Sequence, residues 1–280
     1  MEEVKVQPVD FERLAAILPP GRAERFAEAA VRARAAFGDR VVWHVNATAH
    51  GGGVAEMLQT QLAYANGSGI VNRWLVLSGD AHFFAITKRV HNMLHGTVGD
   101  GGPLGAAERA HYDEVLRANL DQLLGRVSAG DIVLLHDPQT AGLIEGLRGV
   151  GARVIWRCHV GRDESNDVTD AAWAFLRPDV AQAEAVVFSR REYAPDWIDS
   201  ERLAVIPPPS TRWRRRTCRW SRRTWRQSSS TSVWSPARGG KTSSASSGRT
   251  GPREWCVPAL RESSWGVVSP LRATCRWWCR

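Results

Sequence analysis

The sequence is short of the features that mark membrane, secreted and metal-binding proteins. No run of apolar residues approaches the roughly 18 that a membrane-spanning helix needs, so no membrane partner is expected. The acidic start, residues 1–4, has no apolar segment like that of a secretory signal, which favours a cytoplasmic protein. Without such a signal, and without paired C-x-x-C spacing, we expect neither disulfides nor a cysteine zinc cluster. His91 and His95 lack the glutamate of the zinc motif H-E-x-x-H, so we expect no metal.

The end of the chain lacks whole classes of residue. Residues 211–280 contain no Ile, Phe, Tyr, Asn, Asp, His or Met. They hold 16 of the 37 Lys and Arg residues, 2 of the 29 acidic residues and 8 of the 13 Trp. Because periodic aliphatic runs are missing, we expect a disordered, low-complexity basic tail over residues 210–280. The missing types mostly have AT-rich codons, so we hypothesise a change of reading frame near residues 207–210. A genuine basic tail is the alternative.

The net charge of +8 hides an opposite balance in the rest of the chain. Residues 1–210 carry 21 bases against 27 acids, which makes them mildly acidic. Basic charge and Trp in the tail could bind phosphates and stack on bases. The tail carries no signature of a DNA- or RNA-binding module, so we expect nucleic-acid binding to be adventitious.

Residues 1–209 contain the aliphatic runs that the tail lacks, and these runs alternate with helical segments. Such alternation is typical of a parallel sheet covered by helices on both faces. We predict an α/β fold with a Rossmann-like sheet over residues 39–209, preceded by a helical extension over residues 1–38. The expected strands cover residues 40–46, 73–77, 131–136, 153–159, 185–189 and 203–206. The expected helices cover residues 21–37, 54–66, 82–94, 106–127, 141–149 and 170–183.

Polar or glycine-rich sequence follows four of these strands, at the edge where parallel sheets bind ligands. The first such segment contains Gly51, Gly52 and Gly53, between an expected strand and a helix. Glycines let the backbone approach a ligand, and a helix N-terminus favours anions, which suits a diphosphate or a sugar hydroxyl. The segment is neither the Rossmann G-x-G-x-x-G motif nor a Walker A loop. A tight turn without a ligand is the alternative.

Asp137 and His159 are candidate sugar contacts at two other strand ends. The Asp137 carboxylate could accept hydrogen bonds from sugar hydroxyls, or it could cap a helix whose first residue is Pro138. His159 could hydrogen-bond a hydroxyl of a transferred hexose, or it could be purely structural. Nothing marks Cys158 as an activated nucleophile, so we expect a buried strand residue.

Arginines near these strand ends are candidate contacts for phosphate or for the cleft wall. Arg157 and Arg162 flank His159 and could face phosphate. Arg190 follows the fifth strand and either lines the cleft or belongs to a solvated charged turn.

Taken together, these segments resemble the trehalose synthases of glycosyltransferase family 4. The likeness covers about residues 35–208 and stops where the composition changes. The matching segments are residues 42–48 with the glycine loop, 74–80, 83–88, 136–142, 156–162 and 205–208.

The resemblance implies the N-terminal, acceptor-binding domain of a GT-B enzyme, in which two Rossmann-like domains face a cleft. It implies metal-free transfer of glucose from a nucleoside-diphosphate glucose, the co-substrate, to glucose as acceptor. The product would be trehalose, formed with anomeric retention. By position, Asp137 would hold the acceptor and His159 a donor hydroxyl, as candidate catalytic residues. The candidate substrate-binding residues are Asn46, Gly51, Gly52, Gly53, Gln139, Arg157, Arg162 and Arg190.

The sequence departs from this family pattern beyond about residue 209. We find no second Rossmann-like domain, no Arg/Lys pair at the family spacing and no Glu-rich motif there. We therefore expect little or no transferase activity from the chain as printed. A sugar-binding remnant without turnover is the alternative. A homodimer is compatible with the sequence. The sequence does not indicate which nucleotide base the sugar donor carries.

Overall fold

The computed structural model describes residues 1–19 and 21–208. The tail predicted for residues 210–280 and the hypothesised change of reading frame lie outside the described residues. Within the described range, seven strands form one sheet in the order β1-β3-β2-β4-β5-β6-β7. Neighbouring strands pair in parallel, except that β1 runs antiparallel to β3. The strands are β1 Glu2–Val4, β2 Val42–Asn46, β3 Asn72–Val76, β4 Ile132–His136, β5 Arg153–Cys158, β6 Ala185–Phe188 and β7 Leu203–Val205.

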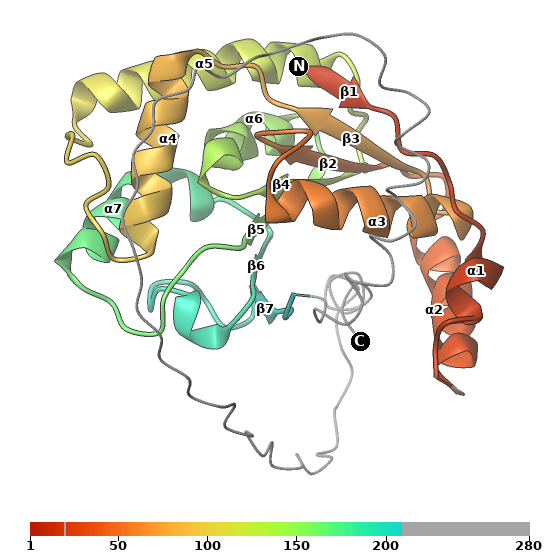
Figure 1. Cartoon of the computed structure of the whole chain (residues 1–280). Helices are drawn as coiled ribbons and strands as arrows, with labels where there is room; N and C mark the ends of the chain where they lie inside the picture. The colour runs from red at the N-terminus through yellow and green to blue at the C-terminus, as the bar shows by residue number, and fades with distance from the viewer. Residues whose placement is uncertain (20, 209–280) are drawn as a thin grey trace, which may run out of the picture. The chain divides into compact units, whose positions relative to one another are not determined.

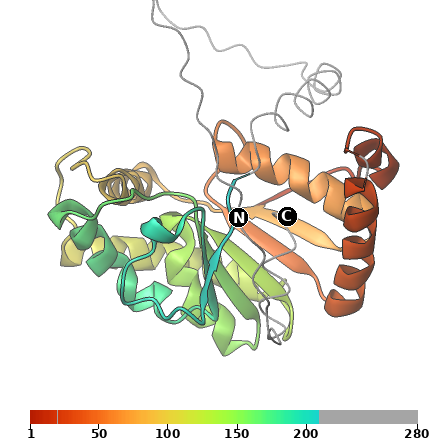
Figure 2. The same ribbon diagram turned by 90° about the horizontal axis from the view of Figure 1, so that it is seen from below.

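Helices cover both faces of this sheet (Figures 1 and 2). One group consists of α4 Ala81–Leu94, α5 Ala106–Leu124, the 3-10 helix η1 Pro138–Leu143, α6 Ile144–Gly149 and α7 Asp167–Val180. The other group consists of α1 Phe11–Ala15, α2 Arg22–Phe37 and α3 Gly53–Gly67. A second 3-10 helix, η2 Arg191–Tyr193, follows β6. Among the described helices, none combines the length and apolarity needed to cross a bilayer.

The strands are apolar because both of their faces are buried. On β2 and β4, Trp43, Val45, Val133 and Leu135 enter the larger core under α4 to α7. The alternate positions enter a smaller core with Ala33 and Phe37 of α2; they include Val42, Ile132 and Leu134. Near the carboxyl ends of the strands this second face changes from apolar to polar, because His44, Asn46 and His136 continue the alternation.

The predicted α/β class and the Rossmann-like parallel sheet are confirmed. All six expected strands and all six expected helices are present, with shifted ends. Helix α7 begins at Asp167, three residues early, because the Asn166 side chain accepts the Thr169 backbone N–H at 2.9 Å. The helix expected over residues 141–149 is preceded by η1, in which Pro138 holds the first position.

The predicted helical extension over residues 1–38 also contributes a strand. Strand β1 pairs with β3, and Glu3 forms ion pairs with Arg73 at 3.8 Å and Arg126 at 3.0 Å. So short and acidic a strand shows no hydrophobic periodicity, which explains why the sequence pattern did not reveal it.

Candidate functional site

The parallel strands bring the predicted site residues to one edge of the sheet. Asn46 ends β2, Asp137 follows β4, His159 follows β5 and Arg190 lies shortly after β6. Because β2, β4, β5 and β6 are neighbours, segments far apart in the sequence meet at this carboxyl edge. Sequence reasoning predicted this edge as the place where a ligand binds.

Three histidines lie side by side across neighbouring strands, and we call His44, His136 and His159 the histidine row. His44 Nδ1 lies 3.2 Å from His136 Nε2, and His136 Nδ1 lies 3.2 Å from His159 Nε2. Both pairs of rings are stacked, with centroids 5.5 and 5.4 Å apart. Each distance is that of an N–H···N hydrogen bond, so the row is a continuous chain.

The histidine row is neutral at physiological pH. Burial and the nearby Arg157 cation lower the pKa of His44 to about 3, although a hydrogen bond with Asn72 opposes the shift. Burial and Arg157 likewise lower the pKa of His159 to about 3. The pKa of His136, buried between its two neighbours, lies well below the ordinary value. Each ring therefore carries a single proton, which can donate on one side only.

Asp137 is held in an unfavourable backbone conformation. Its φ of 64° and ψ of 174° fall in a region essentially restricted to glycine, and among the described residues no other non-glycine has positive φ. Trp156 Nε1 and the Thr140 hydroxyl donate to its carbonyl at 3.2 and 3.0 Å. Tyr112 donates to the next carbonyl, that of Pro138, at 2.7 Å. A turn braced on several sides is typical of a site where geometry matters for function.

The Asp137 carboxylate does not cap the helix that follows it. One oxygen instead accepts the His159 backbone N–H at 2.7 Å, which ties the ends of β4 and β5 together. Burial raises the pKa of Asp137 to about 6, while this hydrogen bond and the Arg157 charge act against the shift. The carboxylate is therefore mostly ionised at pH 7 and can still accept hydrogen bonds.

Arg157 is a buried cation with unused hydrogen-bonding capacity. Its residue is 3% exposed, on the strand between His136 and the β6 residue Val187. Its Nε and Nη2 have no hydrogen-bond partner among residues 1–19 and 21–208. Buried charges are normally paired, so this guanidinium favours an anionic group at the carboxyl edge.

The glycine loop leads from β2 into α3. Gly51 has a φ of 77°, and a side chain there would meet nothing within 4 Å, so its backbone lies open. Asn46 anchors the loop, because its Nδ2 donates to the Thr48 carbonyl at 2.8 Å and its Oδ1 accepts Trp74 Nε1 at 2.8 Å. The structure thus gives Asn46 a role in the protein's own hydrogen bonding, beside the predicted substrate contact.

The remaining predicted residues lie around the rim. Gln139 is half-buried in η1, beside Asp137. The guanidinium of Arg162 lies against Gly96, where a side chain would collide with it. Arg190 forms ion pairs with Asp163 at 3.1 Å and Glu192 at 3.3 Å, all half exposed.

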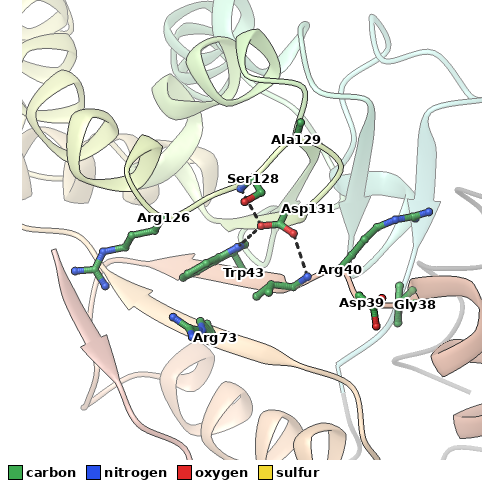
Figure 3. Close-up of a pocket in the computed structure, with 11 residues that line it drawn as sticks. Gly38, Asp39, Arg40, Trp43, Arg73, Arg126, Ser128, Ala129 and Asp131 are labelled. Atoms are coloured by element: carbon green, nitrogen blue, oxygen red, sulfur yellow. Dashed lines mark hydrogen bonds between the residues drawn. The ribbon is translucent and has the colours of Figure 1, made fainter.

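A separate hollow of about 550 Å³ opens at the opposite, amino edge of the sheet (Figure 3). Its floor holds Asp131, which accepts hydrogen bonds from the Val41 and Ser128 backbones and from Trp43 Nε1, at 3.0 to 3.1 Å. None of the predicted site residues lines it. Arg73 and Arg126 on its wall form ion pairs with Glu3. The charged groups of Asp131, Arg73 and Arg126 thus have partners within the protein.

Sequence reasoning missed several residues that build the carboxyl edge. The sequence patterns give His44 no role, although its ring lies in one row with those of His136 and His159. A search for polar residues at matching alternate positions of adjacent strands would have found the row. Within the described residues no cluster of three or more His, Cys, Asp or Glu could hold a metal ion.

Comparison with known proteins shows that the chain is similar in sequence to trehalose synthases. A family model described as trehalose synthase, N-terminal domain, matches residues 44–195. A trehalose synthase of Rubrobacter xylanophilus is 39% identical over 60% of this chain and 39% of its own length. One from Thermococcus litoralis is 34% identical over 61% of this chain and 39% of its own. A solved structure, apo OtsA, superposes with a TM-score of 0.41 and 17% identity, over 55% of this chain and 41% of that one. The chain spans about two fifths of the length of these curated relatives.

Proposed function

The chain belongs to the trehalose synthase N-terminal domain family of glycosyltransferases, and we propose that its carboxyl edge binds glucose as the acceptor of a retaining glucosyl transfer. The donor in this proposal is a nucleoside-diphosphate glucose, and the product is trehalose. The observation that carries the proposal is the strained, braced Asp137, whose carboxylate is tied to His159 and lies beside the unpaired Arg157 cation.

In this proposal Asp137 orients the acceptor. One carboxylate oxygen already accepts the His159 N–H, which leaves the other to accept a hydroxyl of glucose. Hydrogen bonds to a charged group contribute about 1.5–3 kcal/mol, and the buried surroundings favour the upper part of that range. Neutral His159, whose backbone N–H this carboxylate holds, contacts a hydroxyl of the adjacent donor glucose without adding charge.

The donor side relies on positioning and charge stabilisation. No protein nucleophile is needed if the leaving phosphate helps the acceptor hydroxyl attack from the same face, which explains retention. The enzyme then supplies orientation and fixed charges. We assign the open backbone at Gly51 and the buried guanidinium of Arg157 to the anionic side of the donor.

For the chain as printed, we propose sugar recognition without appreciable turnover. Residues 210–280 contain no recognisable Arg/Lys pair or Glu-rich motif of the kind that would hold the nucleotide sugar. Incubation of the full chain with glucose and ADP-, UDP- or GDP-glucose should yield no trehalose above background. Trehalose formation at ordinary enzymatic rates would overturn this part of the proposal.

Glucose binding tests the acceptor site directly. Calorimetric titration of the full chain with glucose should give saturable binding, and Asp137→Asn should weaken it about tenfold or more. Asp39→Asn, in the hollow at the opposite edge, is the matched control and should leave the affinity unchanged. Equal affinities of Asp137→Asn and the parent chain would remove Asp137 from the acceptor site.

A further inference from the structure

The histidine row extends from the buried interior to the candidate site. His44 and His136 are 2% and 1% exposed, whereas His159 is half-buried at the strand end. The proposed function uses His159 alone and gives the other two rings no role. Two successive N···N contacts of 3.2 Å nevertheless couple all three imidazoles.

The buried end of the row sets its direction. Asn72 Nδ2 donates one hydrogen to Asn66 Oδ1 at 3.2 Å and the other to the Ile70 carbonyl at 2.8 Å. Its Oδ1 is therefore the atom left to act on His44, whose pKa the Asn72 side chain raises against the effect of burial. Since His44 Nδ1 faces His136, the nitrogen left for Asn72 is Nε2, and an acceptor oxygen there favours a proton on Nε2.

Each ring then fixes the next. A neutral imidazole has one N–H, so a proton on His44 Nε2 leaves its Nδ1 as an acceptor. His136 must therefore donate from Nε2, which leaves its own Nδ1 to accept from His159 Nε2. The last nitrogen, His159 Nδ1, is left with a lone pair and no described partner.

We propose that His44 and His136 are positioning residues that hold His159 in the Nε2–H tautomer, so that Nδ1 meets the ligand as a hydrogen-bond acceptor. An acceptor at this point selects a hydroxyl group, which donates, over a phosphate oxygen, which only accepts. This inference rests on the proposed function only in assigning that hydroxyl to a sugar.

The tautomers can be observed without any enzymatic activity. Long-range proton–nitrogen NMR of the full chain, with ¹⁵N-labelled histidine, distinguishes the Nε2–H, Nδ1–H and doubly protonated forms. At pH 7 we expect all three rings of the row to be Nε2–H, each assigned by its loss in a single His→Phe variant. Detection of His159 as Nδ1–H or as a cation would overturn the proposal, whatever the variants do.

Removal of the middle ring nitrogens tests the coupling. His136→Phe keeps an aromatic ring but no donor or acceptor, so we expect the His159 signals to become a mixture of both tautomers. His111→Phe, in the surface pair with His82, is the matched control and should leave His159 unchanged. A His159 that stays purely Nε2–H in folded His136→Phe would show that the row does not fix it. If His136→Phe fails to fold, His44→Phe gives the same test from the buried end.

Adding glucose to the same sample tests the proposed acceptor site separately from the tautomer assignment. We expect glucose to shift the His159 Nδ1 resonance in the parent chain. Row tautomers as expected but no shift at saturating glucose would overturn the proposed acceptor site and leave the tautomer assignment standing. A glucose shift on a His159 that is Nδ1–H would overturn the row and leave sugar binding intact.

Discussion

Two aspartates flank strand β4, one at each edge of the sheet, and the protein treats them differently. Asp131 precedes the strand and accepts three hydrogen bonds from its surroundings. Asp137 follows the strand and has a positive φ; its carboxylate accepts one hydrogen bond and has a raised pKa. The hollow of about 550 Å³ lies at Asp131. A carboxylate satisfied by its own protein contributes to stability, whereas a strained and under-bonded one is available to a ligand.

Removal of Asp131 should give the largest effect on stability. Asp131→Ala removes the acceptor of the buried Trp43 Nε1 and of two part-buried backbone N–H groups, and an unsatisfied buried donor costs about 1–3 kcal/mol. We expect urea denaturation to show a loss of about 4 kcal/mol, with glucose affinity preserved in the folded fraction. Asp39→Ala, an exposed residue of the same hollow, should change stability by less than about 0.5 kcal/mol. A small loss for Asp131→Ala would end the contrast between the edges.

Burial of the Asp137 carboxylate should make the free energy of unfolding depend on pH. Its folded pKa of about 6 exceeds the ordinary 3.8, so near pH 5 the folded protein holds a proton that the unfolded chain has released. Stability from this group is therefore full below pH 4 and is lost as the pH rises through 6. Relative to Asp137→Asn, the free energy of unfolding should fall by about 2.4 kcal/mol between pH 4 and 7, then level off.

The comparison with Asp137→Asn isolates this group from the histidine row, which titrates in both proteins. Urea denaturation at pH steps between 4 and 8 measures the difference directly. Parallel pH curves for the two proteins would mean that Asp137 is not held in a protonation-sensitive state.

Replacement of Arg157 tests whether a buried group with unsatisfied hydrogen-bond donors lowers the stability of the protein. Arg157→Met removes an unpaired buried charge and keeps most of the volume, so we expect a gain in stability of about 2 kcal/mol. The pKa values of His44 and His159 should rise, because the Arg157 charge helps to lower both. Arg153→Met, at the exposed start of the same strand, is the control and should change stability by less than about 0.5 kcal/mol. A loss of stability in Arg157→Met would show that the guanidinium already has a partner.

The sequence predicted those features of the fold that follow from hydrophobic periodicity and from the order of the strands. Alternation of apolar strands with helices predicted the parallel sheet, and the strand ends predicted the edge that holds Asp137 and His159. It could not show which polar groups are satisfied, because that depends on contacts across strands. Asp131 and Asp137 look alike in the sequence. Only the fold shows that Trp43 donates a hydrogen bond to Asp131 and that the His159 backbone N–H donates one to Asp137. Strand β1 and the histidine row could not be predicted from the sequence either, because neither produces a recognisable pattern within a single segment.

Arg190 at the rim should give the smallest effect and thereby sharpen the contrast. Its ion pair with Asp163 spans 3.1 Å, but both side chains are about half exposed, so water and salt screen the charges. A double-mutant cycle with Arg190→Gln and Asp163→Asn should give a coupling of less than about 0.5 kcal/mol at low salt and almost none at high salt. A coupling above about 2 kcal/mol would mean that rim charges rival the buried groups. In that case the difference between the two edges of the sheet could not be assigned to Asp137, Arg157 and the histidine row alone.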